Sequence, residues 1–152
     1  MSRPPHTPIG LLLTRVAKEA SRAFDEALAA AGGSLPVWLI LLSLKTRQIA
    51  NQRELADAIG IQGATLTHHL DAMEADGLVA RRGDATNRRI RLVELTKKGE
   101  ALFLELRAAA VAFDRHLRAG LSADDVEALE RLLGRLGENV AGSTSGTSGS
   151  DA

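Results

Sequence analysis

Apolar residues recur every three or four positions at both ends of the chain, which is the spacing of one face of an α-helix. The first such stretch covers residues 9–27 and ends before the pair Gly32-Gly33. A second helix, with Ser34 as its cap, is apolar on nearly all sides over residues 37–44. A helix of that kind is expected to be buried on most of its sides.

The centre of the chain predicts two helices joined by a tight turn. Asn51 and Glu54 have the spacing of a capping box at the start of a short helix, and Gly60 can adopt the left-handed conformation that ends it. A longer helix is predicted for residues 62–75, before Gly77. Its apolar face consists of Leu66, Leu70 and Met73.

Two short runs, residues 78–82 and 90–95, predict β-strands, and the turn formers between them predict a hairpin with an Arg-rich tip. Thr96 caps a helix that runs to about residue 118. Ser122 begins the last helix, whose apolar residues are Val126, Leu129, Leu132, Leu133 and Leu136. The Gly- and Ser-rich residues from 142 onward predict a flexible tail.

The composition excludes several classes of protein. The 152 residues are 45% hydrophobic and 25% charged, which is typical of a globular domain with one core. No cysteine is present, so disulfides, thiolate metal sites and thiol redox sensors are excluded. Aromatic residues make up only 3%, too few for a platform that stacks single-stranded bases. Without a membrane-length apolar run or a signal peptide, a cytoplasmic protein with no membrane contact is expected.

The formal net charge is zero, which by itself argues against a polyanionic partner such as DNA. The charges are unevenly distributed, however. Residues 51–77 have a balance of −4, whereas residues 78–99 carry seven cations against two anions, a balance of +5. A run of cations is often only a solvated face, so the surrounding elements have to decide its role.

The order of elements is that of a winged helix-turn-helix, in which the second helix enters the major groove of duplex DNA. The predicted fold is therefore mainly α with a small β-hairpin wing. The helix face opposite the apolar row carries the candidate DNA-binding residues Gln62, Gly63, Ala64, Thr65, Thr67 and His68. At the tip of the wing, Arg88 and Arg89 are expected to meet the minor groove or flanking phosphates.

Several short motifs resemble those of the multiple-antibiotic-resistance regulator (MarR) family. They are Leu55-Ala56-x-x-Ile59, Thr65-Leu66-Thr67-x-x-Leu70, Glu74-x-x-Gly77-Leu78-Val79 and Leu95-Thr96-x-x-Gly99. The family's wing signature, Asp-x-Arg-x5-Leu-Thr, stands here as Asn87-x-Arg89-x5-Leu95-Thr96. Asn87 lacks the carboxylate that could orient Arg89, and Asp84 is a candidate replacement. The resemblance extends over residues 8–138.

The resemblance implies a homodimeric transcription regulator with no cofactor, bound to a pseudo-palindromic operator. Residues 1–33 and 99–140 would hold the dimerisation helices, residues 34–98 the DNA-binding domain, and residues 141–152 a disordered tail. The apolar faces at both chain ends independently favour a dimer, because a chain of this size has little else to bury them against. The expected dimer contacts are Leu12, Val16, Leu129, Leu132, Leu133 and Leu136, and the expected wing contacts are Arg82, Asn87, Arg88 and Arg89.

Family members often bind a small aromatic acid or phenol, which releases the DNA. Trp38, Arg15 and His6 are the candidate ligand contacts, although a tryptophan in an apolar helix is more often part of the core. His68 and His69 are adjacent and point to different faces, which disfavours a shared metal ion. His69 is expected to pack against the domain. One of Arg81 and Arg82 is expected to pair with Glu94 or Asp84.

Two other functions compete with a ligand-released repressor. A winged helix can act as a protein-interaction module, and the acidic residues 51–77 would allow that, but such a module does not require arginines at the wing tip. An enzyme is disfavoured, because the sequence contains no catalytic triad, carboxylate pair, phosphate loop or metal box.

Overall fold

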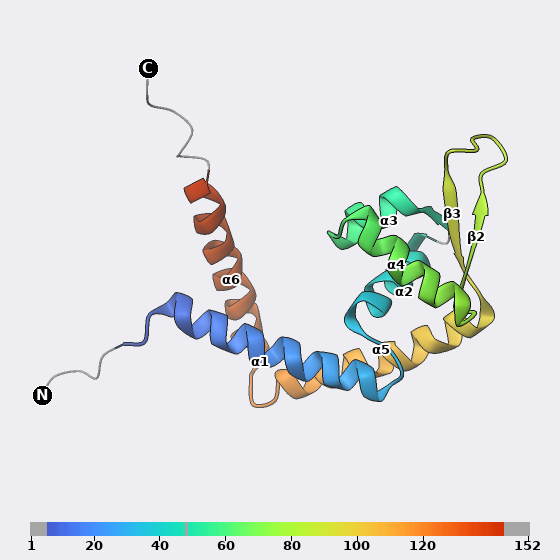
Figure 1. Cartoon of the computed structure of the whole chain (residues 1–152). Helices are drawn as coiled ribbons and strands as arrows, with labels where there is room; N and C mark the ends of the chain where they lie inside the picture. The colour runs from blue at the N-terminus through green and yellow to red at the C-terminus, as the bar shows by residue number, and fades with distance from the viewer. Residues whose placement is uncertain (1–5, 48, 145–152) are drawn as a thin grey trace, which may run out of the picture. The chain divides into compact units, whose positions relative to one another are not determined.

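A computed structural model describes residues 6–47 and 49–144, in which the chain forms helices and a small antiparallel sheet (Figure 1). The helices are α1 (Ile9–Ala30), α2 (Leu35–Arg47), α3 (Gln52–Ile59), α4 (Gly63–Ala75), α5 (Lys97–Leu117) and α6 (Ala123–Thr144). The strands are β1 (Ile49–Asn51), β2 (Val79–Gly83) and β3 (Arg91–Leu95). The predicted fold class, mainly α with a β-hairpin wing, is confirmed.

The chain divides into two compact units, residues 1–113 and 114–152. The core of the first unit is built from the buried apolar side chains of α2 and from the inner faces of α3 and α4. Ile40, Leu41 and Leu44 of α2 are fully buried, which confirms that this helix lies inside the unit. The unit also holds Leu28 of α1 and Phe103 of α5 in its core, and Phe103 stacks on Trp38 with ring centroids 5.6 Å apart.

The predicted helix boundaries have the expected local causes. The side-chain oxygen of Asn51 accepts the backbone N–H of Glu54 at 2.8 Å, so Asn51 caps α3. Gly60 ends α3 with a φ of +76°, a left-handed conformation that other residues adopt at a cost. Gln62 is the N-cap of α4, so the helix itself begins at Gly63, one residue later than predicted from the sequence.

The sheet contains a strand that the sequence pattern did not predict. Its order is β1-β3-β2, with β3 in the centre, and Asn51 of β1 lies opposite Leu92 of β3. The predicted hairpin of β2 and β3 is confirmed, with Val79 opposite Leu95. β1 has only three residues, which is too short to show the alternation by which strands are identified in a sequence.

Thr96 joins the end of the sheet to the start of α5. Its hydroxyl donates to the carbonyl of Gly77 at 2.6 Å and accepts the N–H of Gly99 at 3.0 Å. Gly99 lies so close to the residue that precedes β2 that an added Cβ would collide with the carbonyl oxygen of Leu78. α5 can pack against the sheet at this point only because residue 99 has no side chain.

The second unit contains the end of α5 and all of α6. Ser122 and Asp125 form a reciprocal capping box at the start of α6, with N–H to side-chain oxygen distances of 2.9 and 3.1 Å. Acceptance of the Ser122 N–H and hydrogen bonding to its side chain lower the pKa of Asp125 from its ordinary value. α6 continues to Thr144, so the prediction that the flexible tail begins at residue 141 was wrong. Residues 145–152 lie outside the described part.

Among the described residues, no single helix is both long and apolar enough to cross a membrane. Only α1 and α2 taken together reach that length and composition, and they are bent by 74° relative to each other.

Candidate nucleic-acid interface

α4 presents one apolar face to the core and one polar face to solvent. Leu66 and Leu70 are fully buried and Met73 is 2% exposed, so the apolar row fixes the rotation of the helix. All six residues predicted to contact DNA are consequently exposed: Gln62, Gly63, Ala64, Thr65, Thr67 and His68. The first turns of α4 thus offer small side chains, hydroxyl groups and one imidazole to a ligand outside the domain.

Thr67 connects the polar face of α4 to the start of α3. Its hydroxyl donates to the carbonyl of Gly63 at 3.0 Å and accepts from the Gln52 side-chain amide at 3.4 Å. These bonds set the direction of the hydroxyl group before any DNA arrives. His68 is exposed, and the neighbouring His69 is half-buried, as its predicted packing against the domain requires.

Arg81 of β2 holds the far end of α4. Its guanidinium contacts Asp71 Oδ1 at 2.5 Å and Glu74 Oε1 at 3.1 Å, and its backbone N–H donates to Glu74 Oε2 at 3.0 Å. The hydrogen bonds from Arg81 lower the pKa of Glu74 from its ordinary value. The side chain of Arg81 is only 15% exposed, so the cation ties α4 to the hairpin and is withdrawn from solvent.

The sequence predicts Glu94 or Asp84 as the partner of one of Arg81 and Arg82, and Arg81 pairs with neither of them. Glu74 and Asp71 are seven and ten residues away in sequence, and they approach Arg81 only because the chain reverses at Gly77. The neighbouring Arg82 does pair with Glu94, at 2.5 Å, as one of the two alternatives anticipated. Arg82 is therefore already paired with a carboxylate in the absence of any ligand.

The tip of the wing carries the cations that have no such partner. Arg88 and Arg89 are exposed, and neither forms an ion pair with any residue that the structure describes. The side-chain oxygen of Asn87 accepts the backbone N–H of Arg89 at 3.1 Å, so Asn87 shapes the turn. Asp84 bonds the N–H and hydroxyl of Thr86, both at 2.8 Å, and these bonds lower its pKa. Asp84 thus braces the turn rather than the Arg89 side chain.

The candidate ligand contacts are not brought together. Trp38 is 9% exposed in the core against Phe103, which agrees with the core interpretation of this residue. Arg15 is exposed on α1, and His6 is exposed before α1 begins. A separate cavity of about 410 Å³, which no sequence pattern indicates, lies between the end of α1 and the start of α5. Leu78, Leu102 and Lys98 help to line it, together with the acidic residues Asp76 and Glu105.

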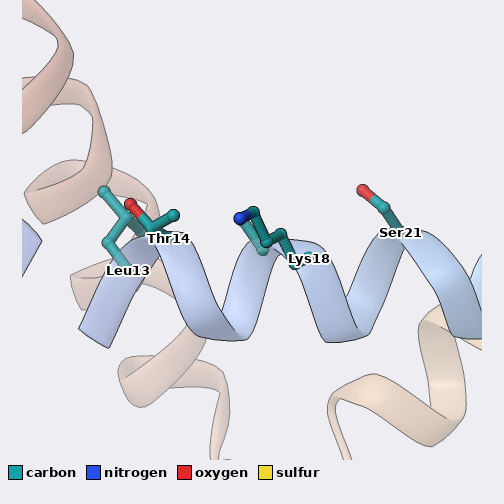
Figure 2. Close-up of a pocket in the computed structure, with 5 residues that line it drawn as sticks. Leu13, Thr14, Lys18 and Ser21 are labelled. Carbon is teal, nitrogen blue, oxygen red and sulfur yellow. The ribbon is translucent and has the colours of Figure 1, made fainter. Parts of the chain in front are cut away.

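α1 and α6 each expose apolar side chains. On α1, Val16 is 48% exposed and Leu12 is half-buried; on α6, Leu129, Leu132 and Leu133 are 42–48% exposed and Leu136 is half-buried. Figure 2 shows Leu13, Thr14, Lys18 and Ser21 along one side of α1, where they line a shallow depression. The described residues contain no group of three or more side chains arranged to hold a metal ion.

Comparison with known proteins agrees with this geometry. Residues 34–90, which include α2 to α4, β2 and the turn that follows it but not β3, match the model of the MarR family. A mutant MarR from Escherichia coli, solved in complex with operator DNA, is 26% identical, with a TM-score of 0.75 over 85% of this chain and 93% of that chain.

Two further solved structures are similar. A probable transcriptional regulator from Pseudomonas aeruginosa is 29% identical, with a TM-score of 0.73 over 85% of this chain and 96% of that one. Bordetella bronchiseptica BpsR, whose DNA binding is regulated by 6-hydroxynicotinic acid, is 24% identical, with a TM-score of 0.73 over 85% and 98% of the two chains. At that identity the likeness to BpsR is a likeness of fold.

Proposed function

We propose that this chain is a MarR-family transcription regulator, a homodimeric repressor that binds a pseudo-palindromic DNA operator and is released by a small aromatic ligand. Members of this family are regulators and not enzymes, so binding alone carries the function. The proposed place of action is the cytoplasm, where the operator would be reached.

One observation carries the DNA-binding part of the proposal. The exposed polar face of α4 and the unpaired Arg88 and Arg89 belong to the same unit. The Arg81 contacts join α4 to β2, the strand that leads to the wing tip. A helix that presents small polar groups suits the major groove, and free guanidinium groups on a hairpin suit the neighbouring phosphates or minor groove. A protein-interaction module would have no need to leave these cations unpaired.

The experiment that tests the proposal is selection of bound duplexes from a random DNA pool. A pseudo-palindromic sequence should be enriched, because two symmetric subunits read two half-sites. Failure to enrich any sequence would contradict sequence-specific binding.

The selected operator then allows a test of base contacts by α4. Thr67→Ala and His68→Ala should change the preference among operator variants if these side chains read bases. Thr46→Ala is a matched control, because Thr46 is also an exposed helical threonine bonded to a carbonyl four residues earlier, on α2. A uniform loss of affinity for all operator variants would instead make Thr67 or His68 a positioning contact.

The cavity between α1 and α5 supports the ligand part of the proposal. Its lining combines the apolar side chains of Leu78, Ala101 and Leu102 with Lys98, whose ammonium suits a carboxylate on an aromatic ring, and it also carries the carboxylates of Asp76 and Glu105. The Lys98 ammonium now donates to the carbonyl of Asp76 at 2.7 Å, and a carboxylate would compete for it. Benzoate should therefore release bound operator from the wild type, and should do so less readily from Lys98→Gln. Contacts from Arg15 and His6 remain predictions.

A further inference from the structure

A second cavity, of about 560 Å³, lies where α3 begins and the wing ends. Its lining comes from two segments that are far apart in sequence: Asn51, Gln52 and Arg53 at the start of α3, and Arg89, Ile90 and Arg91 at the start of β3. Three of these side chains are guanidinium groups, and none of the six is acidic. The cavity is therefore strongly positive although the whole chain has no net charge.

The three arginines are exposed, and no described residue forms an ion pair or a hydrogen bond with their guanidinium groups. Other cations of the same hairpin behave differently, because Arg81 and Arg82 are both paired with carboxylates. Three like charges around one cavity repel each other unless an anion lies between them. The arrangement is that of an anion site rather than of a solvated face.

The strand geometry explains why Arg91 reaches this cavity. Side chains alternate along a strand, so Arg91 lies on the same face of β3 as the buried Val93. Its partner across the sheet is Gly83, which offers no side chain, and an added Cβ there would meet nothing within 4 Å. The core face of the hairpin is thus open at Gly83, opposite Arg91, and Arg91 lines the cavity from that end of β3.

We infer that Arg53, Arg89 and Arg91 form a binding site for a phosphate oxyanion, and that a backbone phosphate of double-stranded DNA fills it. Guanidinium groups match phosphate oxygens with paired hydrogen bonds, which makes arginine the residue suited to this ligand. The DNA source rests on the proposed function, whereas the oxyanion chemistry rests on the cavity alone.

A phosphate held here would also fix the wing. It would link β3 to the start of α3, and α3 is already bonded to α4 through Gln52 and Thr67. One phosphate contact would thereby set the position of the hairpin relative to the helix that enters the major groove. Such a contact carries no sequence information but determines the register in which bases are read.

The first test measures binding of the full chain to the poly(dA-dT) duplex, since phosphate contacts do not depend on sequence. The double variant R53Q/R91Q should bind about tenfold more weakly at fixed salt, because a loss of about tenfold in affinity is expected when one charge-assisted contact is removed. The slope of log K against log salt should fall by about one unit, because the two arginines share one phosphate with Arg89. The matched control R107Q/R115Q removes two exposed cations from α5 and should keep the wild-type slope.

A charge-preserving variant separates the effect of positive charge from the effect of the paired hydrogen bonds that a guanidinium group makes to phosphate. R53K/R91K should restore the salt slope but not the full affinity, because lysine keeps the charge and loses the planar fork. Full restoration of affinity by lysine would contradict a bidentate phosphate site. Circular dichroism and thermal unfolding in chloride should be unchanged in every variant, which excludes loss of the fold as the cause.

The second test identifies the source of the phosphate group. Inorganic phosphate, compared with chloride at equal ionic strength, should raise the melting temperature of the wild type and not that of R53Q/R91Q. If R53Q/R91Q binds the duplex like its control while phosphate still stabilises only the wild type, the ligand is free phosphate and the DNA assignment is wrong. If neither measurement separates the variant from its control, the site is overturned altogether.

The regulator proposal fails independently of this inference. It fails if no operator is enriched from the random pool, whereas the poly(dA-dT) measurement does not require an operator.

Discussion

The arginines of the hairpin differ in whether an acidic partner is within reach. Arg81 and Arg82 are paired with carboxylates, whereas Arg88 and Arg89 at the tip form no ion pair with any residue in the described ranges. A paired cation must give up its carboxylate before it can bind a phosphate, and an unpaired one need not. The effect of a substitution should therefore follow the pairing and not the formal charge.

Arg89→Ala and Arg82→Ala test this at the residue scale. Arg89→Ala should reduce the slope of log K against log salt for duplex DNA by about one unit. Arg82→Ala should change it less, because Arg82 is paired with Glu94 at 2.5 Å. Salt-dependent binding titrations of the two variants provide the measurement. Equal slopes for both variants would show that ion pairing within the hairpin does not affect the contribution of an arginine to the salt dependence of DNA binding.

At the scale of elements, two contacts hold the winged domain together around α4 and α5. Arg81 joins β2 to α4 through ion pairs, and Gly99 lets α5 approach the backbone of Leu78, the residue before β2. The first contact depends on pH and the second on shape. Each therefore predicts a different response to substitution.

The contact between α5 and β2 should not tolerate a side chain at residue 99. Gly99→Ala places a Cβ against the Leu78 carbonyl oxygen and should lower the free energy of unfolding by about 1–3 kcal/mol or more. Gly137→Ala on α6 is the matched control, since its Cβ would meet nothing within 4 Å and alanine favours helix. Urea unfolding at one fixed protein concentration compares the two. An unchanged midpoint for Gly99→Ala would contradict the close approach.

The contact between α4 and β2 should weaken in acid. Hydrogen bonds from Arg81 lower the pKa of Glu74 from its ordinary value of 4.5, so the folded state favours the ionised carboxylate. The resulting stabilisation is present above about pH 4.5 and is lost as the pH falls through the lowered folded pKa. Urea unfolding of the wild type and Glu74→Gln should differ at neutral pH and converge in acid. A constant difference across this range would rule out ionised Glu74 as the source.

At the scale of the whole molecule, the apolar residues of α1 and α6 remain exposed in a single chain. Leu129, Leu132 and Leu133 are each more than 40% exposed, and exposed apolar clusters of this kind are typical of subunit interfaces. A second copy of the chain is the proposed partner. The dimer would also place two winged domains on one operator.

Leu132→Asp combined with Leu133→Asp should therefore convert a dimer into monomers. Two charges inside an apolar interface would have to be desolvated on association. Sedimentation velocity measures the result, and Arg131→Gln on the same helix serves as the control. A double variant that remains dimeric would place the interface elsewhere. A monomeric wild type would contradict the dimer itself.

Much of the fold was predictable because it depends on local signals. The boundaries of α3 follow from Asn51 and Gly60, and the burial of α4 follows from the spacing of its apolar residues, so the exposed face that carries Thr67 and His68 could be identified in advance. β1 could not be identified, because three residues acquire strand geometry only by pairing with β3. The extent of α6 was also underestimated, because a Gly- and Ser-rich composition does not by itself stop a helix at residue 141.

The sequence alone determined which residues of α4 are exposed and which are buried, since periodicity and caps act over a few neighbouring residues. It could not determine which of the hairpin cations are already neutralised. Arg81 meets Asp71 and Glu74 through a chain reversal, and Arg53 shares a cavity with Arg89 and Arg91 across nearly forty residues. Whether an arginine is already paired with a carboxylate or is available to a ligand depends on distances between side chains, and only the tertiary structure sets those distances.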